Sequence, residues 1–128
     1  MKIQVKKLKI KNDSRGSLVE ILHPDDVASE TFGMILVTTA FSNEIKGGHY
    51  HKRKTEWYCV VKGKGLLTLI DRRTNEEKEI NMGGKNMVTV KIPPNYFHKV
   101  KNIGLDEMYL LVYVDEPYNL LDPDTYYD

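Results

Sequence analysis

Short runs of apolar and β-branched residues recur along the chain, with polar turn residues between them. Runs of roughly four to eight such residues, bounded by glycine, proline, asparagine or aspartate, are typical of β-strands. The last run, residues 108–114, is apolar throughout, which indicates a central strand. The predicted strands are 5–11, 18–22, 34–39, 57–61, 66–71, 77–82, 87–92 and 108–114, with a brief one at Val100.

Turn residues fall between these strands at short intervals. Residues 63–65 (Gly-Lys-Gly) and 93–95 (Pro-Pro-Asn) are expected to reverse the chain, and residues 72–76 indicate the polar tip of a hairpin. A helical pattern is confined to residues 25–31, which could hold a single turn. Many strands at this spacing predict an all-β barrel or sandwich, formed by one domain over residues 1–128.

Composition narrows the classes of function. Hydrophobic residues make up 41% and charged residues 29% of the chain, as in soluble globular domains. The formal net charge of +1 gives no electrostatic reason to bind nucleic acid or an anionic membrane. No apolar run approaches the roughly 20 residues of a membrane span, and no signal peptide is expected. The single cysteine, Cys59, lies in an apolar strand, so we expect a packed thiol, a reducing compartment and a cytoplasmic location.

Three histidines and one glutamate form the pattern that carries chemistry. His49 and His51 are two residues apart, which places both imidazoles on one face of a strand. Glu56 opens the next apolar strand, and His98 follows a later turn that a closed barrel can bring alongside. Three imidazoles and a carboxylate suit a borderline divalent metal ion and leave one or two positions open. Zinc is expected first, and iron, manganese, nickel and cobalt fit the same ligands.

The spacing of these residues resembles the two sequence motifs of the cupin family. The first motif, a glycine-led H-x-H followed by a glutamate and a glycine, is matched as His49-x-His51-x4-Glu56-x6-Gly63. The second motif, P-x-G-x-x-H-x-x-x-N, is matched as Pro93-x-Asn95-x-x-His98-x-x-x-Asn102. Asparagine replaces the glycine but tolerates a positive φ, so the turn is expected to survive. The resemblance implies a cupin barrel, the double-stranded β-helix or jelly roll, with the metal at its mouth.

A narrower resemblance covers nearly the whole chain. Residues 13–20 and 46–51 resemble segments of nucleotide-sugar epimerases of the dTDP-4-dehydrorhamnose 3,5-epimerase type. The tail, residues 115–126, is similar to the end of the cupin domain in the bifunctional capsular-polysaccharide reductase–epimerases. His51 stands where the rhamnose-type enzymes carry glutamine and work without metal, so the chain sides with the metal-bearing capsular branch. The capsular enzymes also carry a reductase domain, and this chain shows no G-x-G-x-x-G motif, so any reductase is expected on a separate chain.

The resemblance implies a nucleotide-sugar epimerase or isomerase that acts on a 4-keto-6-deoxy hexose in surface-polysaccharide biosynthesis. Such a reaction needs a base for the proton beside the ketone, an acid on the other face, and a partner for the developing enolate. His49 and Glu56 are the candidate catalytic residues. Because a histidine bound to metal is a poor base, the base could instead be a metal-bound hydroxide or Glu56. Candidate acids are Tyr50, Tyr58, Tyr96, Tyr109 and Tyr113.

Three further residues are candidates for binding the nucleotide sugar. Arg15, in an Asp-Ser-Arg-Gly turn, could hold a phosphate through two hydrogen bonds. Lys46 stands where the epimerases carry arginine, so a bidentate contact would be lost there. Tyr96 lies beside the second motif and is the third candidate.

Other functions fit the same residues. A 3,4-ketoisomerase would use the same enediolate chemistry, and three histidines with a glutamate also permit a metal-dependent dioxygenase. A non-catalytic cupin would bind a nucleotide sugar without turnover. By resemblance to small cupins, strand edges in residues 5–11 and in the aromatic tail predict a homodimer, and the tail is expected to be ordered against the barrel.

Overall fold

Strands account for nearly all the regular structure of the chain, which confirms the predicted all-β class. The computed structural model describes residues 1–128, and its one helix is a single turn, α1 (Pro24–Val27). The structure contains no helix with the length and apolar character that crossing a membrane would need. The strands are β1 (Val5–Lys7), β2 (Ile10–Asp13), β3 (Gly16–Val19), β4 (Met34–Ala40), β5 (Ile45–His49), β6 (Glu56–Lys62), β7 (Lys64–Asp71), β8 (Glu77–Gly83), β9 (Val88–Ile92), β10 (Tyr96–Asn102) and β11 (Met108–Val114).

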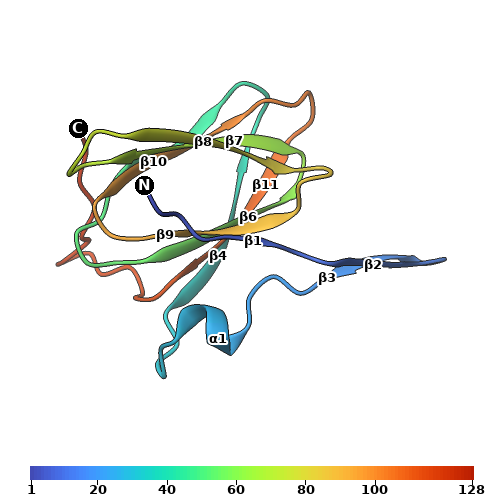
Figure 1. Cartoon of the computed structure of the whole chain (residues 1–128), viewed down its shortest axis with the longest axis horizontal. Coiled ribbons are helices and arrows are strands. Elements are labelled where there is room, and N and C mark those ends of the chain that lie inside the picture. Colours follow the sequence, from blue (N-terminus) through green and yellow to red (C-terminus); the bar gives the residue numbers. More distant parts are fainter.

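Two antiparallel sheets face each other and enclose the core (Figure 1). One sheet has the strand order β1-β9-β6-β11-β4 and the other the order β5-β10-β7-β8. Successive strands such as β5 and β6, or β9, β10 and β11, lie in alternate sheets, so the chain passes repeatedly from one sheet to the other. This is the jelly-roll arrangement of a cupin barrel, and the predicted fold is confirmed.

Alternating side chains from both sheets fill the space between them. Sixteen buried residues form one apolar cluster, in which Val60, Leu67 and Val90 are fully buried. Burial of each such side chain contributes roughly 1.5–3 kcal/mol to stability. β6 is buried on its outer face as well, because Trp57 shares an apolar cleft there with Val19 and other residues of the N-terminal segment.

The strand predicted over residues 5–11 is divided in two. β1 pairs with β9 at the edge of the barrel, whereas β2 pairs only with β3, in a hairpin that stands away from the barrel (Figure 1). Leu8, between β1 and β2, is buried, and its amide donates to the carbonyl of Met87. The strand predicted over residues 18–22 ends at Val19. Val19 pairs with Ile10, which is the first residue of β2, the partner strand of β3.

The two strands that carry His49 and His98 were missed or underestimated. β5 contains Gly47 and Gly48, with φ values of 88° and 89°, and so lacks the run of β-branched residues by which a strand is recognised. β10 was expected only near Val100, because its buried His98 and Asn102 are polar and hide the alternation. Asn95 adopts a φ of 68° just before β10, as the sequence predicted for that turn.

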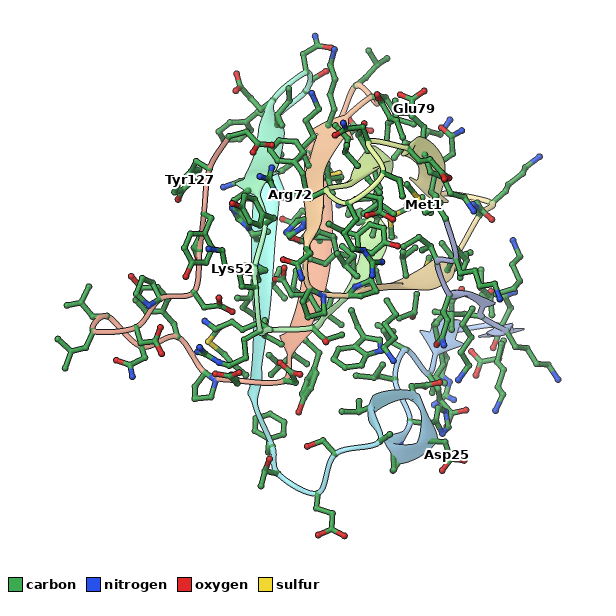
Figure 2. All side chains as sticks on the ribbon, turned by 60° about the vertical axis from the view of Figure 1, so that its left-hand side comes forward. Met1, Asp25, Lys52, Arg72, Glu79 and Tyr127 are labelled. Carbon is green, nitrogen blue, oxygen red and sulfur yellow. The ribbon has the colours of Figure 1, made fainter.

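The tail after β11 folds back onto the barrel, as expected. Tyr126 forms an isolated antiparallel bridge with Tyr50. Asp124 is only 3% exposed. Figure 2 shows the tail passing beside Lys52, with Tyr127 near its end. The tail therefore lies against the segment that follows β5.

Candidate metal centre

Four side chains from three strands and one loop meet inside the barrel. His49 ends β5, Glu56 begins β6 and His98 lies within β10, while His51 follows β5 by two residues. Each of the four offers one ligand atom, and these atoms all lie within 4.8 Å of one another. The structure therefore brings together all four residues that the sequence predicted as metal ligands.

The pairing of β5 with β10 sets this geometry. His98 pairs directly with His49, and a bulge follows between His98 and Lys99. A Cβ atom at Gly47 would lie 3.0 Å from the carbonyl oxygen of His98, closer than carbon and oxygen normally approach. The φ of 88° at Gly47 also favours glycine. The glycine pair thus permits the close backbone approach that places the two histidines opposite each other.

Burial differs across the cluster. His98 is fully buried, His51 and Glu56 are nearly so, and His49 is half-buried. Behind His98, the ring of Tyr58 packs edge-on at 5.6 Å between ring centres. Burial raises the pKa of Tyr58 well above its ordinary value. The cluster is therefore reached from solvent on the side of His49.

Two of the histidines use one ring nitrogen to bind the backbone. Nδ1 of His51 lies 2.7 Å from the carbonyl oxygen of Asp124, and Nδ1 of His98 lies 3.0 Å from that of Tyr96. Because a carbonyl oxygen only accepts hydrogen bonds, each Nδ1 carries a proton and donates it. In the neutral ring this leaves the lone pair on Nε2. Both Nε2 atoms face Oε1 of Glu56, at 2.8 Å from His51 and 3.0 Å from His98.

The charges of the cluster follow from burial and from these contacts. Burial, and after it the neighbouring His98 and His51, lowers the pKa of His49 to about 4. Burial would raise the pKa of Glu56, but the hydrogen bond from His51 and the close approach of the His98 ring nitrogen outweigh it and hold that pKa well below its ordinary value. Burial acts against a charged His51, but the hydrogen bond to Glu56 outweighs it and raises the His51 pKa. The carboxylate is therefore ionised and His49 neutral near pH 7.

This arrangement fits a divalent ion. Nε2 of His98 is buried and has no hydrogen-bond partner, although Oε1 of Glu56 lies 3.0 Å away. In their neutral forms, His51 and His98 would each direct a lone pair at an ionised carboxylate, and a cation between them relieves that repulsion. Histidines that ligate metals commonly donate their other ring N–H to a backbone carbonyl or carboxylate. Three imidazole nitrogens and one carboxylate oxygen are donors that zinc and its neighbours accept.

Comparison with known proteins assigns the chain to a family. The family described as polysaccharide biosynthesis C-terminal domain matches residues 11–126. The chain belongs to this family. A UDP-2-acetamido-2,6-beta-L-arabino-hexul-4-ose reductase of Pseudomonas aeruginosa is 32% identical over 115 residues, which make up 90% of this chain and 30% of that relative. The chain thus spans less than a third of the length of this curated relative.

Solved structures also resemble this polysaccharide biosynthesis C-terminal domain in fold. The capsular polysaccharide assembling protein CapF of Staphylococcus aureus has a TM-score of 0.72 at 30% identity, over 94% of this chain and 32% of CapF. QdtA, a sugar 3,4-ketoisomerase of Thermoanaerobacterium thermosaccharolyticum solved with TDP, has a TM-score of 0.79 at 22% identity, over 98% of this chain and 88% of QdtA. These likenesses confirm the predicted resemblance to the capsular proteins and the shared barrel.

The three predicted substrate-binding residues of this polysaccharide biosynthesis C-terminal domain lie in different places. Lys46 is exposed on β5, where it pairs with Val100. Arg15 lies at the turn of the β2–β3 hairpin, 2.9 Å from a carboxylate oxygen of Asp13, and so away from the cluster of its own chain (Figure 1). Tyr96 packs its ring in the apolar core, and its contact with the cluster is the carbonyl that accepts from His98.

The predicted acid candidates are similarly dispersed. Tyr58 contacts His98 from the core side. The hydroxyl of Tyr113 accepts from the amide of Gly33, the ring of Tyr109 lies against Lys62, and Tyr50 stacks on Tyr126.

Two residues at the cluster were missed by sequence reasoning. The ring of Tyr127 stands edge-on to His49, at 6.1 Å between ring centres. Asp124 binds His51 through its backbone carbonyl. Their only signal in the sequence was the unusual tail string, residues 115–126, which contains Asp124 and ends one residue before Tyr127.

Proposed function

We propose that the chain is a metal-dependent nucleotide-sugar epimerase or isomerase that acts on a 4-keto-6-deoxy hexose in surface-polysaccharide biosynthesis. The observation that carries the proposal is the cluster of His49, His51, Glu56 and His98, in which two histidines are fixed through Nδ1 and direct Nε2 at one carboxylate. The substrate class is supported by the 32% identical relative, whose name describes a UDP-linked sugar with a ketone at carbon 4.

The four residues would hold one divalent ion, with zinc as the first expectation and iron, manganese, nickel or cobalt as alternatives. When bound, such an ion supplies Lewis-acid polarisation of the ketone oxygen. The chain's own contribution is to fix the ligands: the carbonyls of Asp124 and Tyr96 orient His51 and His98. Glu56 lies between these two rings.

His49 is the member of the cluster with the most freedom. Neither of its ring nitrogens makes a hydrogen bond in the structure, and it lies on the side reached from solvent. With a pKa of about 4 it is neutral near pH 7 and can accept a proton. In the proposed step the C–H bond beside the ketone breaks, its electron pair forms the enolate, and the proton passes to Glu56, or to His49 when only His51, Glu56 and His98 serve as ligands. Tyr127, whose ring stands beside His49, is the tyrosine nearest the opening and is the candidate acid that returns a proton.

Exchange with heavy water tests the proposed function. A UDP- or dTDP-linked 4-keto-6-deoxy sugar should gain deuterium at the carbon beside the ketone, because the abstracted proton passes through a group that exchanges with solvent. His49→Ala should abolish the exchange, whereas His23→Ala, at an exposed histidine away from the cluster, should leave it unchanged. A folded, metal-loaded chain that binds these sugars without exchange would instead be a binding module. Oxygen consumption with iron loaded would indicate a dioxygenase.

The proposal includes a homodimer. Ile35 and Val37 on β4 are each 56% exposed, and a neighbouring cleft of about 260 Å³ is lined entirely by apolar residues. The β2–β3 hairpin has no sheet partner in its own chain, and isolated two-stranded hairpins are marginally stable in water. A second copy that covers the apolar face and supports the hairpin would account for both. Sedimentation at micromolar concentration should give a dimer, and a monomer there would contradict the proposal.

We also propose that the reaction takes place in the cytoplasm, with a nucleotide sugar as the small-molecule partner. A reductase is proposed as a separate partner that acts in the same reaction sequence. The support for the reductase is the similarity to a longer relative named as one. A ketone-specific sugar-nucleotide reductase added to the reaction should reduce the keto sugar that this chain produces, and should thereby draw the reaction forward.

A further inference from the structure

The tail forms a short antiparallel pair with the segment that carries the two neighbouring histidines. The amide of Tyr50 donates to the carbonyl of Tyr126, and the amide of Tyr126 donates to the carbonyl of Tyr50, both at 2.9 Å. Tyr50 lies between His49 and His51 in the sequence. The pairing therefore holds the backbone of the tail directly against the backbone of two candidate ligands.

Asp124, two residues before Tyr126, makes the contacts that reach the cluster. Its carbonyl oxygen accepts from Nδ1 of His51 at 2.7 Å. Its carboxylate accepts three consecutive backbone amides, from Lys52 at 3.1 Å and from Arg53 and Lys54 at 3.0 Å each. These amides belong to the loop that joins His51 to Glu56. One residue thus holds both the ring of His51 and the connection between two candidate ligands.

The backbone of Asp124 is itself unusual. It adopts a φ of 49°, which residues with side chains rarely adopt. Such a conformation persists where surrounding contacts determine it. Here the three amides bind the carboxylate and the ring of His51 binds the carbonyl, so the conformation is fixed from both sides.

His51 and His98 differ in what orients them. The carbonyl that binds His98 belongs to Tyr96, two residues earlier on β10, so the strand alone supplies it. The carbonyl that binds His51 comes from the tail, 73 residues away in the chain. The orientation of His98 is therefore a property of the barrel, whereas that of His51 depends on the docking of the tail.

We propose that Asp124 is the positioning residue of the metal centre, and that residues 123–127 are a structural part of that centre. The proposal rests on the metal site of the proposed function. Asp124 fixes the proton of His51 on Nδ1 and thereby directs the lone pair of Nε2 into the cluster. Its carboxylate fixes the loop that sets the separation of His51 from Glu56.

Contacts on either side of Asp124 anchor the tail independently of its carboxylate. The amine of Lys54 donates to the carbonyl of Pro123 at 3.1 Å. The stacked rings of Tyr50 and Tyr126 are flanked by cations, with Arg72 at 3.9 Å from the Tyr50 ring and Lys52 at 4.3 Å from the Tyr126 ring. A change confined to the carboxylate should therefore loosen the aspartate without releasing the tail.

The test compares Asp124→Asn with Asp122→Asn. Asparagine keeps the size of the side chain but replaces an acceptor that serves the loop amides with a donor. Asp122 undergoes the same chemical change at an exposed site, where it pairs only with Arg53, which also binds Glu116. Competition with a chelator should show zinc affinity weakened by about 10- to 100-fold in Asp124→Asn. Asp122→Asn should stay within about twofold of wild type.

A second measurement separates positioning from general stability. In the metal-free chain, NMR should show slowly exchanging Nδ1 protons for both His51 and His98. Asp124→Asn should speed the exchange of the His51 proton and leave that of His98 unchanged, since the acceptor for His98 is on its own strand. Equal zinc affinity with an unchanged His51 proton would overturn the proposal. Loss of both protons together would also overturn it, because that result indicates general loosening.

The wild-type chain provides a test that needs no variant. If the tail orients a ligand, bound zinc must in turn stabilise the tail, since the coupling is reciprocal. Amide exchange at residues 52–54 and at Tyr126 should slow when zinc is added. Zinc that binds and leaves this exchange unchanged would contradict the proposal even if Asp124→Asn failed to fold. A wild-type chain that binds no metal would refute the proposed metal site, whereas the histidine NMR of the metal-free chain still tests the role of Asp124 separately.

Discussion

His49 and His98 are direct partners across the β5–β10 ladder, although one comes from the first half of the chain and the other from near its end. Their ring centres are 4.8 Å apart, with the rings nearly perpendicular. The candidate metal centre therefore depends on strand register, and not only on the loop between His51 and Glu56. A substitution that shifts this register should disturb the centre even though all four candidate ligands remain in the sequence.

Gly47 and Gly48 provide a matched pair for testing the register. Both have φ near 89°, but a Cβ at Gly47 would meet the His98 carbonyl, whereas one at Gly48 meets nothing within 4 Å. Gly48→Ala should cost about 1 kcal/mol of unfolding free energy, from the backbone conformation alone. Gly47→Ala should cost at least about twice that and also weaken zinc binding. Urea unfolding of the metal-free chains measures the difference in unfolding free energy. Equal losses for the two variants would show that the close approach to His98 does not restrict the side chain at residue 47.

Asn102 should be structural, although it belongs to the same motif as His98. Its fully buried side-chain amide donates to the carbonyls of Ala40 and Asp106, at 2.9 and 2.8 Å, and its oxygen accepts from the amide of Gly104. Asn102→Ala should lower the unfolding free energy by about 3 kcal/mol, because buried partners lose their hydrogen bonds.

Metal content is the second measurement on Asn102→Ala, and it should equal that of wild type. Lys101→Ala, an exposed neighbour on the same strand, should change stability by less than about 0.5 kcal/mol. Loss of metal from a folded Asn102→Ala chain would assign Asn102 a part in the site that its contacts do not indicate.

Cys59 should be unreactive and should make stability depend on alkaline pH. Burial raises its pKa from 9.0 to about 11. Because the pKa is raised in the folded state, the contribution is fully present below pH 9 and is lost as pH rises towards 11. The difference in unfolding free energy between wild type and Cys59→Ala should shrink over that range. Iodoacetamide at pH 8.5 should label the urea-unfolded chain and not the folded one, and rapid labelling of the folded chain would refute the buried thiol.

The sequence predicted most of the barrel, because its strands are apolar and bounded by turn residues. It failed at two of the three strands that serve the site. β5 depends on two glycines, and β10 buries a histidine and an asparagine, so neither shows the alternation of an ordinary strand. The β2–β3 hairpin was hidden for another reason: it pairs only with itself, and its residues are mostly exposed.

The four candidate ligands could be predicted because their residue types and their spacing match the two cupin motifs. Asp124 could not, since its main contact with His51 is a backbone carbonyl, which any residue carries. Tyr127 reaches His49 only because the tail folds back onto the barrel. Local sequence cannot specify that docking, which depends on contacts such as those of Tyr126 with Tyr50 and of Asp124 with the loop after His51.

The most direct test of the account is the metal content of the folded chain. Wild-type protein purified without chelator, or reloaded with zinc, manganese, nickel or iron, should contain about one ion per chain by plasma mass spectrometry. His51→Ala and His98→Ala should each abolish this binding, whereas His23→Ala should retain it, because His23 is exposed and lies outside the cluster. A folded wild-type chain that contains no ion and cannot be reloaded with any of these metals would contradict the central claim.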